Sequence, residues 1–145
     1  MLVLDLDRFK SVNDNYGHDI GDLVLRQVAT RLDEITREHD VVARLGGEEF
    51  AVILINQPFS TGAALAEKIV RRVQQERISH PDSEVSSYLS VSVGFSHTSR
   101  TKLESIEQLF SDADAQLYKA KSSGRNRVMH KESQSGRETP SLIAT

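Results

Sequence analysis

The sequence predicts an α+β domain in which helices pack against a central antiparallel sheet. Short apolar runs of strand length alternate along the chain with stretches of helical periodicity. A Gly-Gly pair separates two of the apolar runs, as in a hairpin. The chain has 145 residues, which is enough for one compact domain with a hydrophobic core. These observations favour a single domain that mixes helices with hairpin-linked strands.

The first half of the chain supplies a strand, a helix and a hairpin. Residues 2–7 are an apolar run that ends in acid, and they predict a strand. From Asp19 the apolar residues recur at helical spacing. Their common face is formed by Leu25, Val28, Ala29, Leu32 and Ile35. The runs at 41–45 and 50–55 flank the segment Gly46-Gly47-Glu48-Glu49, which predicts two strands joined by a tight turn.

The second half supplies two helices and two strands. Ser60 or Thr61 is expected to cap a second helix. Its core face is formed by Ala66, Ile69, Val70 and Val73. Residues 74–87 are polar, contain Pro81 and are interpreted as a loop. Residues 89–96 alternate apolar side chains with serines and one glycine, which predicts a strand with one buried face.

The last elements are a third helix and a short strand. The helix is marked by Ile106, Leu109, Phe110, Ala113, Leu117 and Ala120. Gly124 is expected to supply its left-handed C-cap, and residues 126–129 a final strand. The element order contains the β-α-β-β-α-β core of ferredoxin-like folds. Residues 1–130 are therefore predicted to form the domain, and the polar residues 131–145 a disordered tail.

Composition limits the classes of partner. The formal net charge is -3, which gives no general reason to bind nucleic acid or an anionic membrane surface. An anionic ligand would therefore need a local cationic site. The absence of cysteine excludes disulfides, thiolate catalysis and cysteine-based zinc sites. No apolar run approaches the roughly 20 residues of a membrane span, so a cytoplasmic location is expected by default.

Acidic residues gather at two places that the predicted sheet can bring together. Asp5 and Asp7 end the first strand and, two residues apart, point to the same face. Glu48 and Glu49 occupy the tip of the hairpin. If the hairpin pairs beside the first strand, the carboxylates converge, which is costly unless a cation neutralises them. Oxygen ligands with nucleotide phosphates favour Mg²⁺; the alternative is that all four are solvated turn residues.

The residues at the hairpin carry a family resemblance. The segment Gly46-Gly47-Glu48-Glu49-Phe50 resembles the GG[DE]EF signature of diguanylate cyclases, in its GGEEF variant. The segment 5–22 resembles the first conserved block of that family, Ser92-Val93-Gly94 its later strand, and 114–125 its closing helix. The resemblance covers residues 2–129 with every block in order. Family members usually carry a leading helix and a DxLTxLxNRR-like stretch, so the chain is expected to be truncated at its N-terminus.

The resemblance implies a reaction and a metal. Members of the family condense two GTP molecules into cyclic di-GMP with release of pyrophosphate, on a fold like that of nucleotidyl cyclases and polymerase palms. Asp5 and Glu48, with the main-chain carbonyl of Leu6, would hold Mg²⁺, or alternatively Mn²⁺. Glu48 or Glu49 would assist removal of the proton from the attacking hydroxyl, and the sequence leaves open which one.

The resemblance also implies how GTP is held. Asn13 and Asp22 would bind the guanine, because a carboxylate accepts from the N1 and N2 donors of that base. Lys10, which belongs to the catalytic set, would hold the terminal phosphates. The main-chain amides near Arg8 and Phe9 would assist it. Lys121 and Arg125, at the end of the last helix, would add further positive charge.

A second, inhibitory site is implied by an RxxD pattern. Arg37 and Asp40 lie at the distance before the Gly-Gly pair where the family binds its product, cyclic di-GMP. Lys68 stands where the family often has an arginine, and a lysine cannot form the bidentate fork. Reduced product affinity is therefore expected. The alternative is an ordinary surface ion pair.

Three hypotheses for function follow. In the first, the domain is an active cyclase that works as a transient homodimer, because each copy holds one GTP and two copies must face each other. In the second, it is an impaired module that binds GTP or cyclic di-GMP as a regulatory receptor without turnover. The third, a purely structural interaction domain, leaves the ordered series of matching polar residues unexplained.

Overall fold

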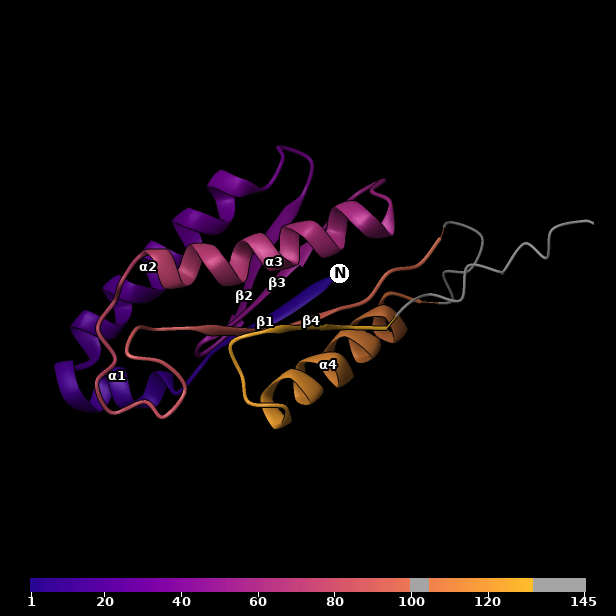
Figure 1. Cartoon of the computed structure of the whole chain (residues 1–145). Coiled ribbons are helices and arrows are strands. Elements are labelled where there is room, and N and C mark those ends of the chain that lie inside the picture. The colour runs from indigo at the N-terminus through magenta and orange to yellow at the C-terminus, as the bar shows by residue number, and fades with distance from the viewer. Residues whose placement is uncertain (100–104, 132–145) are drawn as a thin grey trace, which may run out of the picture.

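The computed structural model describes residues 1–99 and 105–131, which form a sheet covered by helices (Figure 1). The strands are β1 (Leu2–Leu6), β2 (Val41–Gly46), β3 (Glu49–Ile53), β4 (Val91–Phe95) and β5 (Val128–His130). The helices are α1 (Phe9–Tyr16), α2 (His18–Ile35), α3 (Phe59–Gln75) and α4 (Ile106–Ser122). Each strand predicted from the sequence is present, and the α+β class is confirmed.

The strands are ordered β2-β3-β1-β4-β5 across the sheet. The first four pair antiparallel, in the order that the predicted β-α-β-β-α-β core requires. The edge strand β5 pairs parallel to β4, so the whole sheet is mixed rather than antiparallel. The reason is that α4 connects these two strands, and a helical crossover returns the chain in the same direction.

Helices cover both faces of the sheet. In Figure 1, α2 and α3 lie over one face, α4 lies under the other, and α1 lies beyond one end of the strands. Leu2, Leu4 and Leu6 of β1 belong to the main core with α2 and α3. Val3, on the opposite face, packs against Leu117 of α4. All five residues of β1 are therefore buried, as in a strand covered on both sides.

The prediction of one buried face for β4 is wrong. All five of its residues are buried, and so are the flanking Ser90 and Ser96. The face that carries the serines lies under α4, where Ser96 Oγ donates to the Leu109 carbonyl at 2.7 Å. A Cβ on Gly94 would collide with main-chain atoms of α4. Small polar side chains at these positions mark a close helix–sheet contact rather than a solvent face.

The helix ends are partly as predicted. The capping prediction for α3 is wrong, because Ser60 and Thr61 lie inside its first turn and no side chain caps it. The carbonyl of Pro58 begins that helix instead, accepting from Thr61 N at 3.1 Å. At the end of α4, Gly124 has a positive φ of 113°, and Arg125 N donates to the Ala120 carbonyl at 3.0 Å. The predicted glycine C-cap is confirmed, in a Schellman-type arrangement.

One helix has no counterpart in the sequence prediction. α1 is two turns long and mostly polar, and it buries only Phe9 and Val12. A sequence this polar shows little helical periodicity, which is why no helix was predicted here. A helix this short is stabilised mainly by packing, here of Phe9 and Val12 in the core. Gly17, at φ 86°, separates α1 from α2. The predicted first helix therefore begins at His18, one residue before the expected start.

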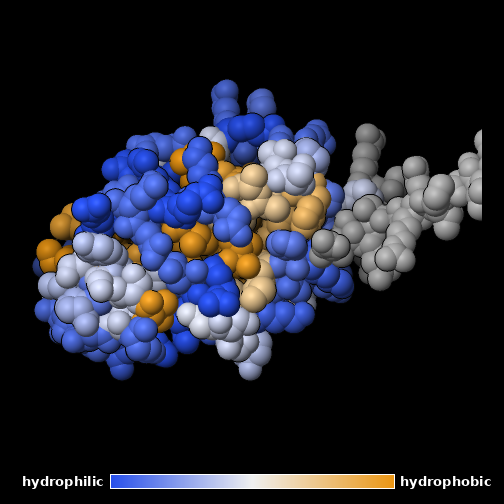
Figure 2. All heavy atoms as spheres, in the orientation of Figure 1, coloured by the Kyte–Doolittle hydropathy of each residue, from blue (hydrophilic) through white to orange (hydrophobic). Residues whose placement is uncertain are grey.

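The outer surface is mainly hydrophilic, with apolar side chains gathered between α3 and α4 (Figure 2). Two residues expected on the core face of α4, Ile106 and Phe110, are exposed. In the described residues, the longest helices are too polar to cross a bilayer. The tail predicted from residue 131 lies, apart from Lys131 itself, outside the described residues.

Candidate functional site

The sheet brings the end of β1 and the tip of the β2–β3 hairpin together. Asp5 lies opposite Glu49 in the register of β1 and β3, and Leu6 N donates to the Glu48 carbonyl at 3.2 Å. Gly46 and Gly47 both have positive φ at the tip, a backbone conformation that glycine adopts without strain. The predicted convergence of acids from β1 and the hairpin is therefore realised.

A pocket of about 230 Å³ opens at this end of the sheet. It is lined by Asp5, Leu6, Asp7, Arg8, Phe9, Lys10, Glu48, Lys121 and Arg125. All of the residues expected to bind metal and phosphate thus line one cavity. Of the predicted catalytic set, Glu49 does not line this pocket and is half-buried beside it.

Asp5 is a buried carboxylate that faces a lysine. Its relative exposure is 8%, and Lys121 Nζ donates to its Oδ2 at 2.8 Å. Burial raises the pKa of Asp5 to about 6; Lys121 opposes the rise, and the nearby Glu48 and Glu49 add to it. A cation beside the carboxylate therefore favours its charged form. Lys121, which arrives from the end of α4, provides that charge in this structure.

Asp7 has a different role from Asp5, although both point to the same face. It is 1% exposed, and its oxygens accept from Ser90 Oγ at 2.7 Å and Ser92 Oγ at 2.6 Å. Asn126 N is a third donor, at 3.0 Å. These bonds tie β1 to β4 and to the segment after α4. Because neutral donors already satisfy the carboxylate of Asp7, it needs no cation, although it lines the same pocket as Asp5.

Cationic side chains reach the pocket from two segments. Arg8 and Lys10 come from the turn after β1 and the start of α1, and Lys121 and Arg125 from the end of α4 and the segment after it. Arg8 adopts left-handed backbone angles, φ 53° and ψ 35°, and begins α1. The first amides of a helix have no intrahelical acceptor and can bind an anion. The local positive charge that an acidic chain would need for an anionic ligand is present here.

The residues expected to bind guanine lie on α1 and α2, outside this pocket. A Cβ on Gly21 would coincide with Asn13 Oδ1, so the Asn13 side chain lies directly on the α2 backbone, next to Asp22. Asp22 itself lines a separate hollow of about 320 Å³ that also contacts Phe50 of β3. The sequence interpretation missed Gly21, whose missing side chain lets Asn13 lie against the backbone of α2.

The RxxD pair forms a compact hydrogen-bonded unit at the other end of the sheet. Arg37 Nε and Nη2 donate to the Asp40 carboxylate at 3.2 and 3.0 Å, and Arg37 Nη2 also donates to the Ile55 carbonyl at 2.6 Å. These hydrogen bonds lower the pKa of Asp40, whose side chain is 2% exposed. Arg37 is 52% exposed. Asp40 thus fixes a guanidinium that faces outward.

Lys68 lies on the exposed side of α3. One helical turn further along, Arg72 Nη2 lies 3.8 Å from Glu34 Oε2 of α2. The two helices are antiparallel, since Glu76 of the α3 end pairs with Arg31 and Arg72 with Glu34. Lys68, earlier in α3, is therefore nearer the C-terminal end of α2, which Arg37 follows. The contacts of the described residues include none between Lys68 and Arg37.

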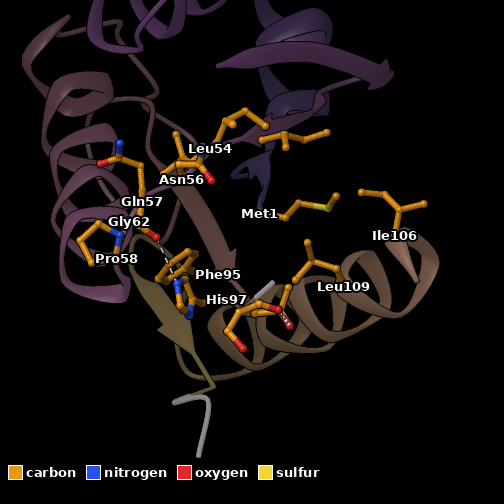
Figure 3. Close-up of a pocket in the computed structure, with 14 residues that line it drawn as sticks. Met1, Leu54, Asn56, Gln57, Pro58, Gly62, Phe95, His97, Ile106 and Leu109 are labelled. Atoms are coloured by element: carbon orange, nitrogen blue, oxygen red, sulfur yellow. Dashed lines mark hydrogen bonds between the residues drawn. The ribbon is translucent and has the colours of Figure 1, made fainter. Parts of the chain in front are cut away.

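A larger hollow of about 470 Å³ lies at the same end as Arg37, where β1 begins (Figure 3). Met1, Phe95, Ile106 and Leu109 give it a mainly apolar lining, with His97 at one side. None of the predicted site residues lines it. In the described part of the chain, no group of three or more His, Cys, Asp or Glu side chains is placed to hold a metal ion.

Comparison with known proteins identifies the family. The model of the family described as "Diguanylate cyclase, GGDEF domain" matches residues 1–127. Diguanylate cyclase A of Treponema denticola is 41% identical over 128 residues, which are 88% of this chain and 34% of that protein. Diguanylate cyclase DgcM of Escherichia coli K12 is 43% identical over 129 residues, 89% of this chain and 30% of that protein.

Solved structures agree with the sequence relatives. The GGDEF domain of DgcB from Caulobacter crescentus, in complex with c-di-GMP, has a TM-score of 0.79 and 37% identity, covering 91% of this chain and 74% of that one. The active GGEEF domain of a diguanylate cyclase from Vibrio cholerae has a TM-score of 0.77 and 34% identity, covering 91% and 82%. The chain spans about a third of the length of the two curated relatives. With its fold and nearly all of its length matched, the chain belongs to the diguanylate cyclase GGDEF domain family.

Proposed function

We propose that this domain is a diguanylate cyclase that converts two GTP into cyclic di-GMP and two pyrophosphates. The supporting observation is the pocket at the end of β1, where Asp5 and Glu48 meet the cations Lys10, Lys121 and Arg125. A nucleoside triphosphate bound with a divalent cation requires both kinds of charge within one cavity. The signature stands here as GGEEF, with glutamate at both acidic positions.

The metal of this proposal is Mg²⁺, with Mn²⁺ as the alternative. Asp5, Glu48 and the Leu6 carbonyl would hold it, and all three are oxygen donors that suit a hard cation. Two carboxylates and one carbonyl are fewer donors than Mg²⁺ usually takes, so phosphate oxygens and water would supply the rest. When bound, the ion supplies positive charge against the reacting phosphate and acidifies a nearby hydroxyl.

The protein's own residues would align the triphosphate and move the proton. Lys10 and the first amides of α1 bind the terminal phosphates, and Arg125 adds charge to the same rim. Lys121 neutralises Asp5 in this structure and can turn to a phosphate oxygen once a cation takes its place. Glu48 or Glu49 accepts the proton of a 3′-hydroxyl as that oxygen attacks the α-phosphorus and the bond to pyrophosphate breaks.

Guanine would be selected by Asn13 and Asp22. The Asp22 carboxylate accepts from the N1 and N2 donors of guanine, and the Asn13 amide both donates and accepts. Adenine would place an acceptor against the carboxylate. The support for Asn13 is that its side chain lies against the backbone of Gly21, the residue that precedes Asp22 in α2.

Two copies of the domain are required by the chemistry. Each pocket holds one GTP, and cyclisation needs two reciprocal attacks, so two copies must face each other as a transient homodimer. Cyclic di-GMP would then bind at Arg37, Asp40 and Lys68 and restrain the domains. Arg37 is exposed and oriented by Asp40, and its positive charge suits a contact to an anionic phosphate. Lys68 offers a point charge only, so product affinity should be reduced.

The test is chromatography of nucleotides after incubation of the purified chain with GTP and Mg²⁺, with ATP as the control substrate. We expect cyclic di-GMP and pyrophosphate from GTP alone. Glu48→Gln should lower turnover at least about 100-fold while the protein remains folded, because it removes a metal ligand and a base candidate. Unchanged turnover of the variant would contradict the role of Glu48. Binding of GTP without product would instead support the receptor hypothesis.

A further inference from the structure

We infer that His80, remote in sequence from the site, is a positioning residue that sets the phosphate-binding turn after β1. The inference rests on the proposed function of the pocket. His80 lies in the loop of residues 77–90, between α3 and β4, which the sequence interpretation treated as a simple connection. Its side chain is 1% exposed, and its Nε2 lies 3.0 Å from the Arg8 carbonyl.

The hydrogen bond fixes the protonation pattern of the imidazole. A carbonyl oxygen only accepts, so Nε2 carries the proton and donates it. The other nitrogen, Nδ1, is buried and has no hydrogen-bond partner among the residues described. An apolar side chain of similar size could fill this position without leaving a polar atom unsatisfied. What the histidine contributes beyond packing is therefore its bond to Arg8.

Arg8 needs such a restraint. Its φ of 53° is in the left-handed region, which is unfavourable for a residue with a side chain. Its carbonyl also accepts from Ser11 N at 3.0 Å, so the bond from His80 adds a second donor to the group that starts α1. The orientation of this peptide determines where the next amides, those of Phe9 and Lys10, point. Both residues line the pocket.

The loop holds the same turn at other points. Asp7 N donates to the Ser90 carbonyl at 2.9 Å, and Arg8 Nη2 pairs with Glu84 Oε1 at 2.6 Å. The Arg8–Glu84 pair is exposed on both sides and is worth little by itself. The His80 bond differs because it is buried and acts on the main chain. It therefore couples the loop directly to the geometry of the phosphate site.

His97 offers a matched control at the opposite end of the sheet. Its Nε2 also lies near a main-chain carbonyl, that of Gln57, at 3.1 Å (Figure 3). Its Nδ1 is likewise buried without a partner in the described residues. The two histidines thus have the same hydrogen-bonding chemistry, but only His80 contacts a residue that lines the phosphate pocket.

The experiment is a calorimetric titration with 3′-deoxy-GTP and Mg²⁺, and in parallel with guanosine. The deoxy nucleotide lacks the attacking hydroxyl and cannot turn over. His80→Leu should weaken binding of 3′-deoxy-GTP on the order of tenfold, about the effect of one hydrogen bond, and leave guanosine binding unchanged. His80→Gln keeps an N–H donor and should recover most of the loss. His97→Leu should bind like the wild-type protein.

Several results would overturn the assignment. One is an unchanged affinity of His80→Leu for 3′-deoxy-GTP. Another is an equal loss of affinity of His80→Leu for guanosine. A third is the same loss of affinity for 3′-deoxy-GTP in His97→Leu. If the wild-type protein itself fails to bind 3′-deoxy-GTP, the proposed function fails, and the assignment fails with it. A thermal unfolding curve of each variant accompanies the titrations and shows whether it is folded.

A second measurement needs no variant and applies even if His80→Leu does not fold. If the loop of His80 stabilises the turn after β1 that binds the nucleotide, then nucleotide binding at that turn must stabilise the loop by the same free energy. Amide hydrogen exchange at His80 and Leu89, whose N–H groups bond to Ser87 and Ile78 within the loop, should slow when 3′-deoxy-GTP is added to the wild-type protein. Exchange at these amides that is indifferent to the nucleotide would contradict the coupling.

Discussion

At the scale of single residues, the two aspartates of β1 show how environment divides one residue type between two roles. Asp7 is saturated by two serine hydroxyls and a main-chain amide. Asp5 is also buried but has one lysine and two nearby glutamates, which leave its carboxylate short of compensating charge. A site that keeps such a group sacrifices stability for function.

Asp5 makes a prediction about stability and pH. Its pKa rises from 3.8 to about 6 on folding, so between these values the folded state binds more protons than the unfolded state. Stability from this group therefore falls as the pH rises through that window. Asp5→Asn should stabilise the metal-free domain at pH 7 by about 1–2 kcal/mol. A shift of two pKa units corresponds to at most roughly 3 kcal/mol, and the attraction of Lys121 is already included in that shift.

The measurement is denaturant unfolding of both proteins in a chelator, at several pH values between 4 and 7. The advantage of Asp5→Asn should grow with pH, and its cyclase activity should be lost. Asp7→Asn is the control, since it breaks a satisfied buried network and should destabilise the protein. A destabilised Asp5→Asn at pH 7 would contradict the account of Asp5.

At the scale of elements, the contact between β4 and α4 places the cations of the pocket. Gly94 and the small serines let α4 lie close to the sheet, and the end of that helix carries Lys121 to Asp5. The Schellman arrangement turns the chain at the end of α4. Arg125, which follows that turn, therefore lines the same pocket. The position of these charges depends on how closely one helix approaches one strand.

Gly94→Ala tests this contact. The added Cβ would collide with the main chain of Ala113 and Leu117, which cannot move without displacing α4. The free energy of unfolding should fall by about 3 kcal/mol or more, as measured by chemical denaturation. Gly62→Ala is the comparison, because the three atoms nearest to its Cβ belong to the side-chain ring of Phe95 rather than to main chain. An equal or smaller loss for Gly94→Ala would show that α4 adapts to the strand.

At the scale of the whole molecule, the pocket at the end of β1 and the RxxD unit lie at opposite ends of the sheet. The hairpin register places Gly46 and Glu49 at the pocket end and Val41 and Ile53 at the other. Arg37 bonds to the Ile55 carbonyl just beyond that far end. Product bound there could not touch the reacting GTP of the same copy, so inhibition would have to act on how two copies meet.

Arg37→Ala should therefore raise the concentration of cyclic di-GMP needed for half-inhibition, by roughly tenfold for the loss of a charge-assisted contact. The measurement is the initial rate at increasing added product, with each variant normalised to its own rate without product. Arg71→Ala, on the exposed side of α3, is the charge-matched control. Inhibition curves that coincide for Arg37→Ala and the wild-type protein would remove the second site from the proposal.

Much of the fold was predictable because the signals are local. The Gly-Gly turn between two apolar runs defined the hairpin, and helical periodicity marked α2, α3 and α4. The predictions that failed depended on distant partners. The serine face of β4 looked exposed until α4 covered it, and polar α1 forms only because Phe9 and Val12 reach the core.

The sequence by itself determined the family signature, the element order and the residue types available for metal, phosphate and base. The tertiary structure alone decided which of them meet. It separated Asp5 from Asp7, brought Lys121 across 116 residues of chain to Asp5, and brought His80 to Arg8. The physical reason is that charge compensation and burial depend on neighbours in space, and a sheet of order β2-β3-β1-β4-β5 makes neighbours of segments far apart in the chain.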